Sequence, residues 1–174
     1  MKKIIFLFCL VLLIASCATT NDRDLNKLSL SEVINKISDS NNLETKNVNT
    51  FFGSYVIDQP IGFGYVFNWK SKQTTDNYFI RDIAASNWKG DPVGILRNLN
   101  LKLDSMNCYS YENAVIDFGL EQKRLSPPNP HSQFSPEPEY YSVKSHEWGE
   151  VKYFFNNQLC LIFVRYTANP KFFH

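Results

Sequence analysis

Two periodicities of hydrophobic and polar residues follow one another along the chain, and together they predict helices packed on a sheet. The clearest helical pattern covers residues 28–38, where apolar side chains recur at the spacing of one helix face. These positions are Leu30, Val33, Ile34 and Ile37. Ser29 and Glu32 have the spacing of a capping box, in which each side chain bonds the backbone of the other residue. The pattern therefore predicts a short helix that packs its apolar face on the rest of the domain.

Alternation with a period of two predicts most of the remaining structure. In the segment 63–70, aromatic side chains occupy every second position: Phe63, Tyr65, Phe67 and Trp69. A sheet that covers a core on one side needs this pattern. Further β-branched and aromatic runs predict strands at 51–57, 78–84, 113–120, 143–155 and 159–166. The last run is apolar on both faces, which indicates a central strand covered on both sides. Polar residues predict loops at 40–49 and 71–77.

A second helix is predicted to begin at Asp91, because an N-cap residue followed by Pro92 at the first helical position is a typical helix start. The apolar positions that follow at a roughly helical spacing are Val93, Leu96, Leu99 and Leu103. Leu99, Leu101 and Leu103 also alternate as in a strand, so the pattern leaves the end of this element open.

These elements predict one α+β domain over residues 28–174. We expect an antiparallel sheet of about six strands with two short helices, and the alternative is a β-sandwich with peripheral helices. Five prolines interrupt the pattern between residues 125 and 141, too densely for a helix or a central strand. This segment is expected to be an extended, Pro-rich loop.

The first seventeen residues have the composition of an export segment. Lys2 and Lys3 precede an apolar run of twelve residues, 4–15, which is too short for a membrane-spanning helix of about 20 residues. The run ends in Ile14-Ala15-Ser16-Cys17, which resembles the lipobox of bacterial lipoproteins. The resemblance covers only this segment, and the mature domain resembles no family that its motifs identify.

The lipobox resemblance implies a subcellular location and a lipid anchor. It implies cleavage between Ser16 and Cys17 and attachment of a diacylglycerol and further acyl chains, palmitate among them, to Cys17. Two or more chains hold a protein stably on a membrane. Ala18 in place of the Asp that retains such proteins in the inner membrane implies the periplasmic face of the outer membrane. Residues 17–27 would then be the lipidated cysteine and a flexible tether. The alternatives are a cytoplasmic-membrane lipoprotein and an ordinary signal cut that yields a soluble periplasmic protein.

Charge and cysteine content limit the function further. Without Lys2 and Lys3, the chain has sixteen Lys and Arg residues and seventeen Asp and Glu residues. Since the sequence also has no cluster of basic residues, it does not predict nucleic-acid binding. Cys108 and Cys160 are an even pair in an oxidising compartment, which predicts a disulfide. The alternative is two separate buried thiols.

The sequence holds no convincing catalytic motif. His146-Glu147 begins like HExxH but Glu150 stands where the second histidine should be, so we predict no metal site, cofactor or catalytic residue. The best binding candidates are Phe134, Tyr140 and Tyr141 in the Pro-rich loop, because prolines lower the entropy lost on binding and aromatic rings supply contact area. The alternative is that this loop is a solvated connector.

Three functions remain open. The first is a non-catalytic binding or accessory module for an envelope protein, a class that includes inhibitor and immunity proteins. The second is a carrier or sensor of a small apolar ligand, in a pocket lined by Tyr65, Phe67 and Trp69. The third is an envelope hydrolase. We predict binding to a membrane through the lipid on Cys17 and to an envelope protein.

Overall fold

A computed structural model describes residues 27–40, 43–58, 64–92, 94–126 and 140–173. In these residues the α-helices are α2 (Leu30–Ser38), α3 (Thr45–Phe52) and α4 (Tyr111–Phe118), with a 3₁₀ helix η2 (Pro170–Phe173). The strands are β1 (Tyr55–Asp58), β2 (Gly64–Trp69), β3 (Lys72–Gln73), β4 (Phe79–Trp88), β5 (Asn98–Leu103), β6 (Arg124–Leu125), β7 (Tyr140–His146), β8 (Gly149–Phe155) and β9 (Leu161–Ala168). None of the described helices is long and apolar enough to cross a membrane.

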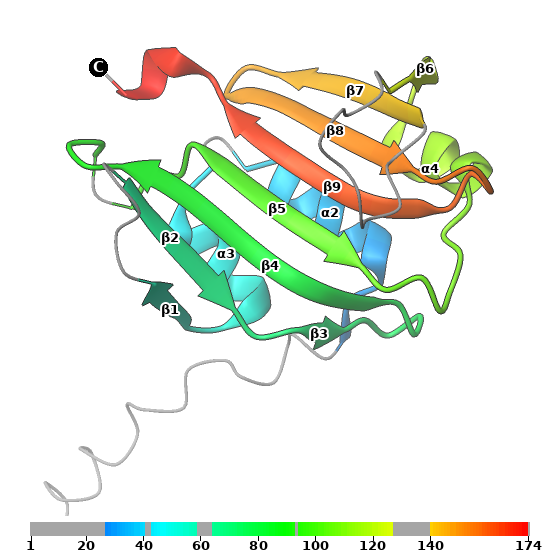
Figure 1. The fold of residues 1–174 in the computed structure, drawn as a ribbon, viewed down its shortest axis with the longest axis horizontal. Helices are drawn as coiled ribbons and strands as arrows, with labels where there is room; N and C mark the ends of the chain where they lie inside the picture. The colour runs from blue at the N-terminus through cyan, green and yellow to red at the C-terminus, as the bar shows by residue number, and fades with distance from the viewer. Residues whose placement is uncertain (1–26, 41–42, 59–63, 93, 127–139, 174) are drawn as a thin grey trace, which may run out of the picture.

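All nine described strands form one antiparallel sheet, with the order β1-β2-β4-β5-β9-β8-β7-β6 and β3 paired to β4 (Figure 1). The α+β class is therefore confirmed. The expected numbers of six strands and two helices are wrong, because the structure has nine strands and three α-helices in its described part. The β-sandwich alternative is also wrong, since the described strands form a single sheet.

The sheet consists of two meanders that meet in its middle. The chain runs from β1 to β5, crosses through α4 to the far edge at β6, and returns through β7 and β8 to β9. Strand β9 then pairs with β5 (Asn98↔Thr167 to Lys102↔Phe163). The last strands of the two meanders, β5 and β9, thus join them into one sheet.

Helix α2 agrees with its prediction in detail. The Ser29 hydroxyl accepts a hydrogen bond from the Glu32 backbone N–H (3.2 Å), and the Glu32 carboxylate accepts one from the Ser29 backbone N–H (2.7 Å). The predicted apolar face is buried against the sheet. Two sheet residues donate to the helix backbone: Tyr166 Oη to the Ile34 carbonyl (3.2 Å) and Trp148 Nε1 to the Ser38 carbonyl (2.9 Å).

The segment 113–120, expected to be a strand, is instead occupied by helix α4. Ser110 caps its start by accepting from the Asn113 backbone N–H (3.2 Å), and Gly119 ends it in the left-handed conformation that glycine favours. Ala114 and Phe118, one helical turn apart, are buried, whereas Ile116 between them is 80% exposed. The apolar positions that seemed to alternate therefore have the spacing of a helix.

The helix expected from Asp91 is absent. Asp91 closes a turn instead, and Leu99, Leu101 and Leu103 belong to strand β5. The Asp91 carboxylate accepts a hydrogen bond from the Trp88 backbone N–H (2.6 Å), behind it in the chain. Gly94 has a φ of +84°, which a continuing helix does not allow. The alternating positions Leu99, Leu101 and Leu103 all face the core.

Three further boundaries differ from the prediction. Residues 45–52 form α3, although the prediction divides them between a loop and a strand. Of the strand predicted at 51–57, only the part that belongs to β1 is extended. The run 143–155 is a hairpin, in which His146 pairs with Gly149. Of the Pro-rich loop, residues 127–139 lie outside the described residues, and its two ends belong to β6 and β7.

The described α-helices cover one face of the sheet. Figure 1 shows α2 and α3 behind the strands, and α4 joins them on that side because Phe118 stacks on Tyr153 (5.0 Å between ring centroids). The Lys144 ammonium also donates to the carbonyl of Phe118 (2.8 Å). No described helix or strand covers the other face, which we call the outer face. Strand β9 is central as expected. Within the described residues it is covered on one face only, so the expected double coverage is not seen there.

Candidate functional site

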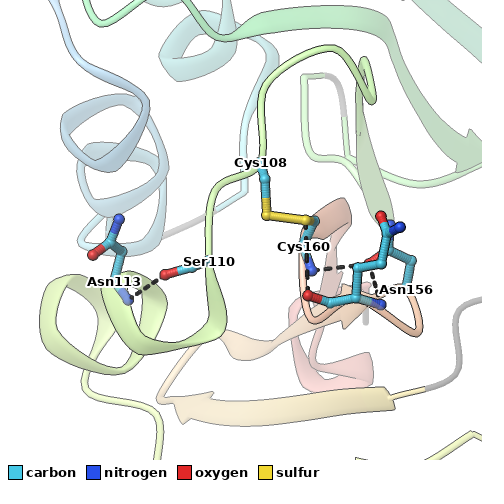
Figure 2. Close-up of a disulfide and its surroundings, with 6 residues drawn as sticks. Cys108, Ser110, Asn113, Asn156 and Cys160 are labelled. Carbon is cyan, nitrogen blue, oxygen red and sulfur yellow. Dashed lines mark hydrogen bonds between the residues drawn. A yellow bond between two sulfur atoms is a disulfide. The ribbon is translucent and has the colours of Figure 1, made fainter.

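The predicted disulfide is present between Cys108 and Cys160 (Figure 2). It joins the segment after β5 to the start of β9, with 4.9 Å between the Cα atoms. Backbone bonds flank it, from Tyr111 N to the Leu159 carbonyl (2.9 Å) and from Leu161 N to the Tyr109 carbonyl (2.8 Å). The crossover to α4 is therefore attached to the centre of the sheet.

The predicted binding residues do not form one surface. Tyr140 and Tyr141 are neighbours in β7, so their side chains point to opposite faces of the sheet. Tyr140 packs on the core, with the Lys123 ammonium 4.8 Å from its ring centroid. Tyr141 lies on the outer face. Phe134 and the predicted lipidation and cleavage residues Cys17 and Ser16 lie outside the described residues.

The aromatic residues proposed to line a ligand pocket belong mostly to the core. Phe67 and Trp69 are buried and contact the Tyr55 ring at 5.1 Å and 5.4 Å between centroids. Trp69 Nε1 donates to the Asn49 side chain (2.9 Å). Tyr65, at the start of the same strand, is exposed. These contacts give Phe67 and Trp69 a packing role.

On the outer face, three aromatic side chains lie side by side across three strands. Strand register places Phe163 of β9 opposite Phe154 of β8, and Phe154 opposite Tyr141 of β7. The Phe154 ring lies 5.4 Å from the Phe163 ring and 6.1 Å from the Tyr141 ring, measured between centroids. We call Tyr141, Phe154 and Phe163 the aromatic row. All three side chains are half-buried.

Cations flank the aromatic row on the same face. Lys102 of β5 is opposite Phe163, and Arg124 of β6 is opposite Tyr141. The guanidinium of Arg165 lies 5.2 Å from the Phe163 centroid and 5.8 Å from the Phe154 centroid, a cation–π geometry. Its Nε donates to the Asn100 side-chain oxygen (3.1 Å), which holds the group over the rings.

These three cations have no carboxylate partner among the ion pairs of the described residues: Lys46–Glu44, Arg81–Asp82, Arg97–Asp91 and Lys152–Glu150. Two carboxylates of the outer face, Asp82 and Glu150, are already paired with Arg81 and Lys152. Asp82 is the cross-strand neighbour of Lys102, but its ion pair is with Arg81. The aromatic row is thus flanked by cations that form no ion pair with a described carboxylate.

A second aromatic–arginine contact lies at the end of β4. Trp88 is 60% exposed, and the Arg97 guanidinium lies 4.0 Å from its ring centroid. Arg97 also donates two hydrogen bonds to the Asp91 carboxylate (2.8 and 2.7 Å). These bonds, with that from the Trp88 backbone N–H, lower the pKa of Asp91 and outweigh the opposing effect of its burial. The arrangement orders an exposed tryptophan.

The strongly shifted titratable groups belong to the covered side of the sheet. Burial raises the pKa of Tyr109, Tyr153 and Tyr166, so these phenols stay neutral at physiological pH. Burial, together with the nearby Lys144 ammonium, lowers the pKa of His146, whose ring stacks on Trp148. In the described part of the chain, no three His, Cys, Asp or Glu side chains are placed to hold a metal ion.

The sequence prediction missed most of this site. Phe163, Arg165 and Thr167 alternate along β9 and share the outer face, a pattern readable from the sequence. The run 159–166 is apolar at both alternating sets of positions, which favours a strand covered on both sides and hides this face. Only Tyr141 of the aromatic row was predicted to bind.

Comparison with known proteins assigns no family to this chain. No protein-family model matches it, and no curated protein does. The crystal structure of a cysteine-rich secretory protein from Staphylococcus aureus is similar to it over 74% of this chain and 44% of that one, with 9% sequence identity and a TM-score of 0.39. This chain thus spans less than half the length of that protein, and a likeness of this degree carries no functional conclusion.

Proposed function

We propose that this protein is a lipid-anchored module of the bacterial envelope that binds another envelope protein through the outer face of its sheet. Its role is binding or accessory, not catalytic. The observation that carries the proposal is the aromatic row with its flanking cations on a sheet face that no described helix or strand covers. Aromatic and arginine side chains are enriched among the residues that dominate protein–protein binding energy.

The disulfide supports the proposed compartment. Disulfides persist in oxidising environments such as the periplasm and are rare in the cytosol. The bridge between Cys108 and Cys160 joins a crossover to a central strand, so it stabilises the domain that carries the outer face. The proposed address is the periplasmic face of the outer membrane, with acyl chains on Cys17.

The anchor is tested by labelling growing cells with an alkyne analogue of palmitate. The full chain should take up the label and fractionate with the outer membrane, and a Cys17→Ser variant should lose both properties. Mass spectrometry of the purified chain should find an N-terminal Cys17 carrying acyl chains. An unacylated chain that begins elsewhere would refute the anchor and leave the binding face untouched.

The binding face is tested by photo-crosslinking in living cells. A photoreactive phenylalanine at Ser145, exposed and on the outer face, should form an adduct with a protein partner. The matched control is the same amino acid at Ile116, which is exposed on α4. An adduct at residue 116 with none at residue 145 would place the contact on the helical side and contradict the proposal.

A further inference from the structure

We infer that the aromatic row binds an acidic polypeptide segment that carries aromatic or large apolar side chains, an inference that rests on the proposed binding function. The five side chains that define the site are consecutive partners across five strands. Their order is Lys102, Phe163, Phe154, Tyr141 and Arg124. An aromatic centre with a cation at each end calls for a ligand with an apolar centre and acidic flanks.

The dimensions suit an extended chain that crosses the strands. Neighbouring strands are about 4.8 Å apart, so Lys102 and Arg124, four strands from each other, are separated by about 19 Å. An extended polypeptide advances about 3.3 Å per residue, so about six residues cover the row. Such a segment can place one apolar side chain on the rings and a carboxylate near each terminal cation.

The charges favour carboxylates at three points. Lys102, Arg124 and Arg165 are exposed and have no carboxylate partner in the part of the chain that the structure describes. Arg165 is held in place by Asn100, so little side-chain freedom remains to be lost when it binds an anion. Hydrogen bonds between guanidinium groups and carboxylates are among the strong ones in proteins.

Two other anionic or planar ligands fit less well. An anionic membrane would cover the whole outer face, including the carboxylates of Asp82 and Glu150, whereas a short peptide needs to contact only the aromatic row and its flanking cations. A glycan needs flat ring faces to stack on. The rings of the aromatic row are tilted against one another by 35° and 45°, so they present a ridge and not a platform.

A random 12-residue peptide library displayed on phage tests the ligand chemistry without a known partner. The library is selected on the purified full-length protein in detergent. Selected peptides should be enriched in Asp and Glu together with Phe, Tyr, Trp or Leu. The best of them should bind an Arg165→Gln variant at least about tenfold more weakly, because a charge-assisted contact is lost. Binding should also weaken as salt is raised.

The control variant is Lys36→Gln. Lys36 is an exposed residue of α2, on the side of the sheet that the helices cover, so this variant removes one positive charge away from the outer face. It should bind the selected peptide like the wild type. Both variants must melt at the wild-type temperature. If Arg165→Gln melts at a lower temperature, Lys102→Gln replaces it as the test.

Several outcomes overturn the inference. Neutral or basic selected peptides do so, as does a library with no peptide whose binding depends on Arg165 or Lys102. Arg165-dependent binding to vesicles of one-third phosphatidylglycerol in phosphatidylcholine would assign the face to a membrane instead. In each case a persistent protein adduct at Ser145 would leave the proposed binding function standing, whereas loss of that adduct alone would refute the function.

Discussion

At the scale of single residues, Asp91 shows how one side chain can close a turn where its sequence context predicts a helix. Its carboxylate is 4% exposed and accepts hydrogen bonds from the Arg97 guanidinium and the Trp88 backbone N–H. An Asp followed by Pro92 is equally suited to a helix start and to a turn. Arg97, six residues further on, decides between them because it binds the carboxylate that would have capped the helix.

Asp91→Asn should lower the free energy of unfolding by about 2 kcal/mol at pH 7, because bonds to a charged group are lost. The pKa of Asp91 is lowered in the folded state, so its contribution is present above the unfolded pKa of about 4 and disappears as the pH falls through the folded pKa. Urea unfolding should therefore show a difference between variant and wild type that shrinks as the pH is lowered below about 4.

The control for this prediction is Asp82→Asn. Asp82 is 61% exposed and its partner Arg81 is 49% exposed, so the pair should contribute less than about 0.5 kcal/mol at any pH. A difference for Asp91→Asn that stays constant as the acid limit of the folded protein is approached would show that the carboxylate charge is not what stabilises the turn.

At the scale of elements, the structure separates patterns that are specific from patterns that are ambiguous. Helix α2 was predictable because Ser29 and Glu32 form a reciprocal cap and four apolar residues follow at helical spacing. Helix α4 was not predictable, because its eight residues fit two patterns. Ala114, Ile116 and Phe118 alternate as in a strand, and Ala114 and Phe118 also have the spacing of one helix face. Packing of Phe118 on Tyr153 selects the helix.

The disulfide is the element-level feature whose removal is easiest to measure. Changing both Cys108 and Cys160 to serine should lower the free energy of unfolding by about 4 kcal/mol, because a loop of 52 residues is no longer closed in the unfolded chain. Guanidinium unfolding of the oxidised wild type and the double variant gives this difference. The reduced wild type serves as control and should match the variant. A loss below about 1 kcal/mol would show that the flanking backbone bonds hold α4 and β9 together unaided.

At the scale of the whole molecule, the two meanders share one core that begins with α2. The Leu28 carbonyl accepts a hydrogen bond from the Thr75 backbone N–H (3.0 Å), and the Asp76 carboxylate accepts one from the Leu30 backbone N–H (3.0 Å). The start of the helix is thereby tied to the loop between β3 and β4. These contacts show where the packed structure begins among the described residues.

A chain that starts at Lys27 should therefore keep the melting temperature of the chain that starts at Cys17, in one cooperative transition followed by circular dichroism. A chain that starts at Val33 loses the Ser29 cap and the fully buried Leu30, so it should melt at a much lower temperature or fail to fold. A large loss on removing only residues 17–26 would contradict this boundary.

The sequence by itself determined what depends on nearest neighbours and on chemistry: the cap of α2, the alternation of β2, the α+β class and the pair of cysteines able to bridge. These follow from side-chain spacing and thiol chemistry, which the chain carries wherever it folds. Only the tertiary structure decided that β5 and β9 pair, that the helices cover one face, and that Lys102, Phe163, Phe154, Tyr141 and Arg124 align. These residues lie on five strands between residues 102 and 163, and the register of strand pairing, which the alternation within one strand does not encode, brings them into line.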